Sequence, residues 1–170
     1  MLTLPEPLSL RPIAAADTAF LTQVYGSTRE EELAQVAWQP GQKQAFIEMQ
    51  FAAQHAHYQQ HYRDAMFAII EHAGEAAGRL YLARWASEYR IVDIALLPAF
   101  RGRGLGTAIL NVIITTAADH GLPVSIHVER FNPALRLYQR LGFEFVSEYG
   151  VYYLMRRPIN EEPDARNSDD

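Results

Sequence analysis

Three alternate glycines that lead straight into a helix constrain the fold of this chain more than any other feature. They lie at Gly102, Gly104 and Gly106, between a strand-like run that ends at Pro98 and a helical run that begins at Thr107. Glycine permits positive φ and leaves the backbone bare, so a ligand can approach it closely. A helix start adds unpaired N–H groups and the positive end of the helix dipole. The segment therefore predicts an anion-binding turn between a strand and a helix.

Three phosphate-binding patterns can be compared with this turn. A Walker loop needs a lysine after its last glycine, but Thr107 follows Gly106. A dinucleotide fingerprint needs a third glycine where Thr107 stands, and it lies earlier in a chain than this turn does. A third pattern, Arg/Gln-x-x-Gly-x-Gly/Ala, matches Arg101, Gly104 and Gly106. The structural alternative is a tight turn that needs glycines and binds nothing.

Hydrophobic patterns elsewhere predict a meander of strands followed by strands that alternate with helices. The strand-like runs are 8–11, 66–71, 79–85, 89–97 and 124–129, with a hairpin over 143–157. The helical runs are 17–25, 27–36, 42–62, 107–119 and 133–141. We expect the first helix to stop at Gly26 and the second to open with a capping box from Ser27 to Glu30. This order predicts an α/β (α+β) fold with a mixed sheet covered by helices.

Charge and cysteine content exclude several function classes. Lys and Arg total 15, Asp and Glu total 20, and residues 160–170 carry five acids against one arginine, which is −4 of the net −5. The rest of the chain is near neutral, without the basic excess that nucleic acid requires as a main partner. The chain has no cysteine, which excludes disulfides, thiolate metal sites and a cysteine nucleophile. We predict no metal site.

The two ends of the chain are predicted to be loose. Residues 1–7 contain two prolines, and residues 159–170 form an acidic tail that is too polar to bury much surface, which leaves a single domain at 8–158. The start of the chain lacks the basic and apolar segments of a signal peptide, and no run of about 18 apolar residues exists. These features predict a cytoplasmic protein without a membrane partner, and they leave a homodimer open.

A second motif gives the chain a family resemblance. The run 132–143 begins with Asn132, places Tyr138 in a helix and closes in Leu-Gly-Phe. Together with the Leu-Arg-Pro start at 10–12, the Leu-Leu-Pro strand end at 96–98 and the glycine turn, it makes the chain resemble the GCN5-related N-acetyltransferase (GNAT) superfamily over residues 8–157. One residue fewer than in many members separates Asn132 from Tyr138.

The resemblance implies a mostly antiparallel sheet of about seven strands and acetyl-CoA as the donor. The acetyl group would pass directly to a primary amine of a small molecule or of a protein or peptide. The alternative is a non-catalytic regulatory module that binds acetyl-CoA or CoA. The resemblance also implies the donor-binding residues, which are Leu96, Leu97, Arg101, Gly102, Arg103, Gly104, Leu105, Gly106, Thr107, Asn132 and Tyr138.

Direct transfer requires a proton donor, a carbonyl-polarising group and a base. The resemblance implies Tyr138 as the acid for the leaving thiolate and the backbone amide of Leu97, or of its neighbour, as the donor to the thioester carbonyl. We predict Glu129 as the base, with His127 and Asp93 as alternatives. For each of the three, the other possibility is a hydrogen-bonded strand residue without a catalytic role.

An acidic run at Glu30, Glu31 and Glu32 is the predicted site for a cationic acceptor. Carboxylates are also favoured in the first turn of a helix, so helix stabilisation is the alternative role for these three residues.

Overall fold

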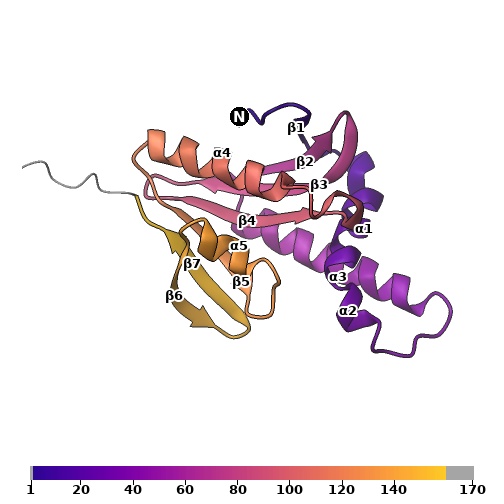
Figure 1. Ribbon diagram of the computed structural model, residues 1–170. Coiled ribbons are helices and arrows are strands. Elements are labelled where there is room, and N and C mark those ends of the chain that lie inside the picture. The colour runs from indigo at the N-terminus through magenta and orange to yellow at the C-terminus, as the bar shows by residue number, and fades with distance from the viewer. Residues whose placement is uncertain (1, 160–170) are drawn as a thin grey trace, which may run out of the picture.

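The computed structural model describes residues 2–159, and residues 160–170 of the predicted acidic tail lie outside the described residues. Its framework is a seven-stranded sheet with the order β1-β2-β3-β4-β5-β7-β6 (Figure 1). Neighbouring strands are antiparallel, except that β4 and β5 are parallel. The strands are β1 (Leu8–Pro12), β2 (Met66–His72), β3 (Glu75–Arg84), β4 (Tyr89–Leu96), β5 (Val124–Glu129), β6 (Glu144–Tyr149) and β7 (Tyr152–Arg157). The predicted mixed, mostly antiparallel sheet is confirmed.

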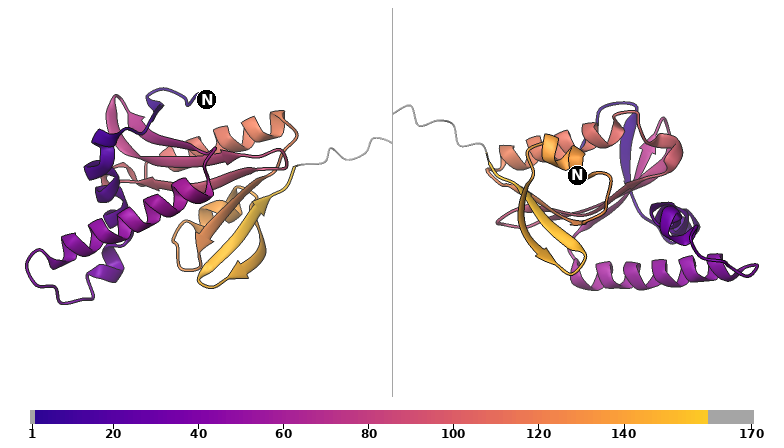
Figure 2. Two further views of the ribbon diagram at one scale, coloured as in Figure 1. Left: turned by 180° about the vertical axis from the view of Figure 1, so that it is seen from behind. Right: turned by 60° about the horizontal axis from the view of Figure 1, so that its bottom comes forward.

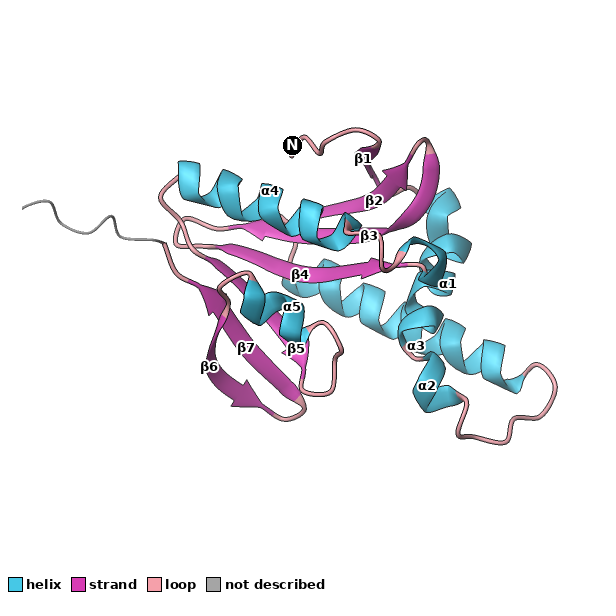
Figure 3. Cartoon of the chain, viewed as in Figure 1, coloured by secondary structure: helices cyan, strands magenta, loops and turns pink. Residues whose placement is uncertain are grey.

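Helices cover both faces of this sheet (Figures 2 and 3). They are α1 (Thr18–Thr28), α2 (Glu30–Leu33), α3 (Gln42–His61), α4 (Leu105–Asp119) and α5 (Leu135–Arg140), with short 3₁₀ turns at Ala15–Asp17 and Pro98–Phe100. Helices α4 and α5 lie on one face, where Ile109 and Ile113 of α4 are fully buried in the main core. Helices α1 and α3 lie on the other face, where Leu21 and Phe51 pack with Ile69 of β2. Among residues 2–159, no helix has the length and apolar character needed to cross a membrane.

The predictions for the first two helices are wrong in their boundaries. Helix α1 runs through Gly26 to Thr28, and Ser27 lies inside it, where its hydroxyl donates to the carbonyl of Val24 at 2.7 Å. There is therefore no capping box at Ser27; α2 begins at Glu30 without a side-chain cap and ends at Leu33. Gly26 allows close helix packing, because a Cβ there would lie 3.3 Å from the side chain of Ile47 in α3.

The central parallel pair of strands separates part of the way along its length. Pairing between β4 and β5 joins only Tyr89, Arg90 and Ile91 to residues 124–126. Beyond Ile91 each strand stays paired with its other neighbour, β4 with β3 and β5 with β7, and the two diverge (Figure 3). The sheet therefore contains a V-shaped gap, and the carboxyl end of β4 lies on one side of it.

Candidate active site

The edge of β4 that faces the gap carries backbone groups that β3 does not use. The N–H of Leu97 donates to the carbonyl of Ala77 at 2.8 Å, so Leu97 faces β3. Because hydrogen-bonded pairs alternate along an antiparallel ladder, the backbone groups of Ile94 and Leu96 face the gap instead. The side chain of Arg101 confirms this direction, since its Nε donates to the Leu96 carbonyl at 2.9 Å. Leu97 is therefore not a free donor. The prediction left its neighbour as the other choice, and the N–H of Leu96 faces the gap.

The glycine turn follows the carboxyl end of β4 and leads into α4. Gly102 and Gly104 have φ of 72° and 76°, a conformation that glycine adopts without strain. Gly104 is the N-cap of α4, and no side chain caps the helix. The first helical hydrogen bond runs from Ala108 to Gly104 at 3.0 Å, so the N–H groups of Leu105, Gly106 and Thr107 have no partner within the helix. The helix begins two residues before the predicted Thr107.

The backbone of this turn is open to a ligand. A Cβ built at Gly102, Gly104 or Gly106 would meet no heavy atom within 4 Å. Two exposed arginines add positive charge beside it: Arg101 also reaches Ser27 Oγ at 3.3 Å, and the guanidinium of Arg103 lies 5.5 Å from the centre of the Phe100 ring. Bare N–H groups at a helix start, flanked by arginines, are able to bind an anion.

Tyr138 and Asn132, which sequence reasoning paired, have different surroundings. Tyr138 lies in α5, is 4% exposed and packs edge-on against Phe143 at 5.8 Å. Burial, together with the negative charge of Asp93, raises the pKa of the Tyr138 hydroxyl, so that it holds its proton at neutral pH. Asn132 uses its side-chain oxygen to accept the N–H of Ala134 at 2.8 Å. That contact orders the turn before α5, and only the amide NH₂ group of Asn132 remains for a donor molecule.

Two of the three candidate bases, Glu129 and His127, lie on β5, and the third, Asp93, lies on β4. Glu129 is exposed, is paired in register with Tyr152 of β7 and has no ion-pair partner within 4 Å among residues 2–159. The pKa of Tyr152 is raised mainly by burial and secondly by the negative charge of Glu129. Partial burial and the charge of Arg90 lower the pKa of His127, which favours its neutral form. Both Glu129 and His127 thus remain open as bases.

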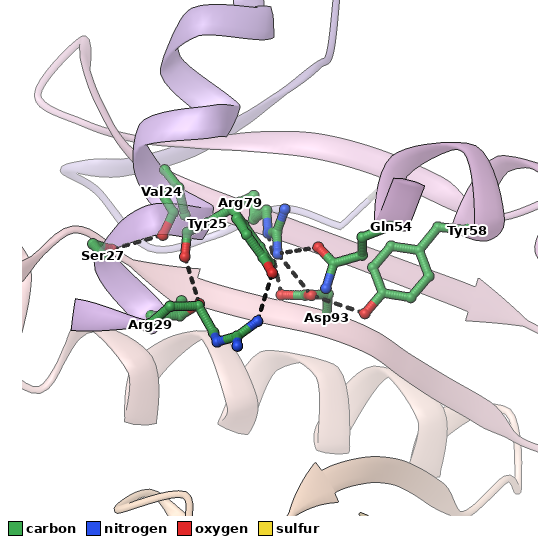
Figure 4. Close-up of polar contacts among 9 residues, drawn as sticks. Val24, Tyr25, Ser27, Arg29, Gln54, Tyr58, Arg79 and Asp93 are labelled. Atoms are coloured by element: carbon green, nitrogen blue, oxygen red, sulfur yellow. Dashed lines mark hydrogen bonds and ion pairs between the residues drawn. The ribbon is translucent and has the colours of Figure 1, made fainter. Parts of the chain in front are cut away.

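A polar cluster lies on the α3 face of the sheet and is made of Gln54, Tyr58, Arg79 and Asp93 (Figure 4). Of its members, only Asp93 was predicted from the sequence, as an alternative base. Arg79 is 2% exposed, and its Nε and Nη2 donate to the two oxygens of Asp93 at 3.2 and 2.9 Å. Nη2 also donates to Gln54 at 2.9 Å, and the Tyr58 hydroxyl donates to Asp93 Oδ2 at 3.1 Å. The signal that could have revealed the cluster is a pair of opposite charges in two neighbouring apolar strands.

The three glutamates of α2 are exposed and only partly free. Glu32 accepts two hydrogen bonds from Arg29, at 3.1 and 2.9 Å, and Glu30 lies 3.9 Å from Lys43. Arg29 also donates to the hydroxyl of Tyr25 at 2.7 Å (Figure 4). Glu30 lines a surface hollow of about 710 Å³ together with Leu97, at the end of β4. The structure therefore brings Glu30 to the β4 side of the site.

Comparisons with known proteins agree with this geometry. The model of the acetyltransferase (GNAT) family matches residues 29–143. A PaiA N-acetyltransferase from Thermoplasma acidophilum, solved with coenzyme A, superposes with a TM-score of 0.65 at 16% identity and covers 89% of this chain and 98% of its own. The ribosomal L7/L12 α-N-protein acetyltransferase RimL, also solved with coenzyme A, gives a TM-score of 0.62 at 18% identity, over 94% and 98% of the two chains.

A relative by sequence is an uncharacterized protein of Mycobacterium leprae, 32% identical over 66 residues. The match covers 39% of this chain and 18% of that protein, so the chain spans less than a fifth of the relative's length. At 16% and 18% identity, the two structural neighbours show a shared fold.

Proposed function

The chain belongs to the acetyltransferase (GNAT) family, and we propose from this premise that it transfers the acetyl group of acetyl-CoA directly to a primary amine. The amine would belong to a small molecule or to a protein or peptide. The observation that carries the proposal is the gap between β4 and β5, which leads directly to the uncapped start of α4 at the glycine turn. This arrangement offers an extended strand edge and, next along the chain, a helix start whose first N–H groups have no partner within the helix.

The residues of the turn suit the phosphates of the donor. The N–H groups of residues 105–107 would bind the pyrophosphate, with Arg101 and Arg103 adding charge. The open space at Gly104 and Gly106 is what a phosphate lying against bare backbone requires. The N–H groups of Leu96 and Ile94 would then hold the extended arm of the donor and polarise the thioester carbonyl, whose oxygen gains charge during attack.

The side chains around the gap supply the proton transfers. The amine nitrogen forms a bond to the carbonyl carbon, the carbon–sulfur bond breaks, one proton leaves nitrogen and one reaches sulfur. Tyr138, which its environment keeps protonated, would donate the proton to sulfur. Glu129 would accept the proton from nitrogen, and His127 is the second candidate for that role. All of these groups lie within the proposed single domain at 8–158.

The proposal is tested by measuring both binding and turnover. Calorimetry should detect acetyl-CoA binding, and a thiol reagent should detect release of free CoA when primary amines are added. The chain has no cysteine, so the protein gives no thiol background in this assay. Absence of binding would contradict the proposal. Binding without turnover on any small amine or peptide amine would support the alternative, a regulatory module that binds CoA without transferring acetyl groups.

A further inference from the structure

The hydroxyl of Tyr58 has a fixed orientation that leaves its oxygen free. A phenolic hydroxyl has one hydrogen to donate, and that of Tyr58 is directed at Asp93 Oδ2, 3.1 Å away. Arg79 holds the same carboxylate through two hydrogen bonds, so Asp93 cannot turn away from Tyr58. The remaining capacity of the Tyr58 oxygen is to accept a hydrogen bond. Burial and the charge of Asp93 raise the pKa of Tyr58, which keeps it a neutral hydroxyl.

This hydroxyl is placed beside the part of β4 where transfer is proposed. Asp93 lies two residues beyond Ile91, the last residue of β4 that pairs with β5, and it directly precedes Ile94, whose N–H faces the gap. The charge of Asp93 contributes to the raised pKa of Tyr138 in α5 and to that of Tyr152 in β7. Arg79 is closed off at 2% exposed, whereas Tyr58 is only partly buried. Of these two side chains, Tyr58 is therefore the one with more surface exposed to solvent.

We propose that the Tyr58 oxygen accepts an N–H of the acceptor amine and thereby selects primary over secondary amines. The inference rests on the proposed acetyl transfer. Asp93 is a positioning residue, which acts by fixing the direction of the Tyr58 hydroxyl.

The selection follows from counting hydrogens on nitrogen. A neutral primary amine has two, so it can donate one to Tyr58 and lose the other to the base after attack. A neutral secondary amine has only one, and that hydrogen must leave as the amide forms. The contact with Tyr58 can therefore persist through the reaction only for a primary amine, and its contribution should appear only with such acceptors.

The matched variants are Tyr58→Phe and Tyr62→Phe. Tyr62 lies one helical turn further along the same face and packs edge-on against Tyr58 at 6.2 Å; its hydroxyl has no hydrogen-bond partner among the described side chains. The probes are phenethylamine and trialanine, each compared with its N-methyl form. We expect Tyr58→Phe to lower kcat/KM about tenfold for the faster primary amine, in keeping with the loss of one hydrogen bond. It should change kcat/KM for the N-methyl amine less than twofold and leave the KM of acetyl-CoA unchanged.

Three results would overturn this inference. The first is an unchanged kcat/KM for the primary amine in a folded Tyr58→Phe variant. The second is an equal fall for the primary and N-methyl amines, and the third is an equal fall in Tyr62→Phe, which would indicate helix packing alone. If the wild-type protein acetylates neither primary amine nor its N-methyl form, the proposed transfer to these amines fails and the selection by Tyr58 fails with it.

Discussion

Two regions lie near the gap between β4 and β5: the glycine turn at 101–107 and the cluster around Arg79 and Asp93. The first offers groups of the main chain, and the second consists of side chains. The turn offers main-chain N–H groups, and its helix start has no side-chain cap. The cluster consists of side chains, and most of its polar atoms bond to one another (Figure 4). Backbone N–H groups without a partner are able to bind a ligand, whereas a cluster of side chains that bond to one another holds those side chains in position. The two regions should therefore respond differently to mutation. Changes in the glycine turn should alter the affinity for a ligand, and changes in the cluster should alter the stability of the protein.

The largest expected effect is a loss of stability in the cluster. Asp93→Asn removes the negative partner of Arg79, which is 2% exposed, and leaves a buried charge without compensation. We expect the free energy of unfolding to fall by about 3–5 kcal/mol, as measured by urea unfolding. The control is Glu32→Gln in α2, which removes the ion pair between Arg29 and Glu32. Their side chains are 28% and 57% exposed, so the expected loss in the free energy of unfolding is below about 1 kcal/mol. Equal losses in the two variants would contradict the contrast between the regions.

The next effect is on the rate of the chemical step. Tyr138→Phe keeps the ring that packs against Phe143 and removes only the hydroxyl. We expect kcat to fall by roughly 100-fold, near the lower end for a general acid, because a thiolate is already a fair leaving group. The affinity for acetyl-CoA should change little in calorimetry. Tyr153→Phe, whose ring packs against Phe145 of β6, is the control and should keep the wild-type kcat. A wild-type kcat in Tyr138→Phe, with chemistry rate-limiting, would make Tyr138 a packing residue only.

The same contrast explains which parts of the site could be predicted from the sequence. The order of the strands along the chain, helix α4 and the anion turn follow from local patterns, because glycines and a helix start determine the backbone within a few residues. The cluster could not be found in this way, since Tyr58 and Asp93 are 35 residues apart and Arg79 and Asp93 are 14 apart. The direction of the Leu97 N–H depends on the pairing of β4 with β3, which no local pattern reports. The prediction of a capping box at Ser27 is wrong because Ser27 lies in the last turn of α1. The sequence from Ser27 to Glu30 fits a helix cap equally well, so the local pattern does not distinguish the two positions.

A smaller effect is expected on the affinity for acetyl-CoA at the glycine turn. Two variants of Gly104 separate the contribution of charge from that of backbone conformation. Gly104 has φ of 76°, which Asn and Asp adopt more easily than other non-glycine residues. Gly104→Asn and Gly104→Asp therefore share the same backbone strain and differ in charge. We expect the dissociation constant of acetyl-CoA to rise about tenfold more in the aspartate variant, about 1.4 kcal/mol, because its carboxylate would lie where the pyrophosphate binds. Equal affinities in calorimetry, with both variants folded, would remove the anion site from the turn.

The smallest effect is expected on the acceptor KM when α2 is changed. The charges of α2 are exposed, so solvent and salt weaken their attraction for a ligand. Replacing Glu30, Glu31 and Glu32 together with glutamine removes three exposed charges from α2, of which Glu30 lines the hollow at the end of β4. If they attract a cationic acceptor, its KM should rise roughly threefold at low salt and less at 0.15 M salt, where the Debye length is about 8 Å. Donor affinity should stay constant, because the glycine turn lies in a different part of the site. The alternative role gives the opposite pattern: a lower melting temperature, from losing carboxylates in the first turn of a helix and the Arg29–Glu32 pair, with no change in acceptor KM at any salt concentration.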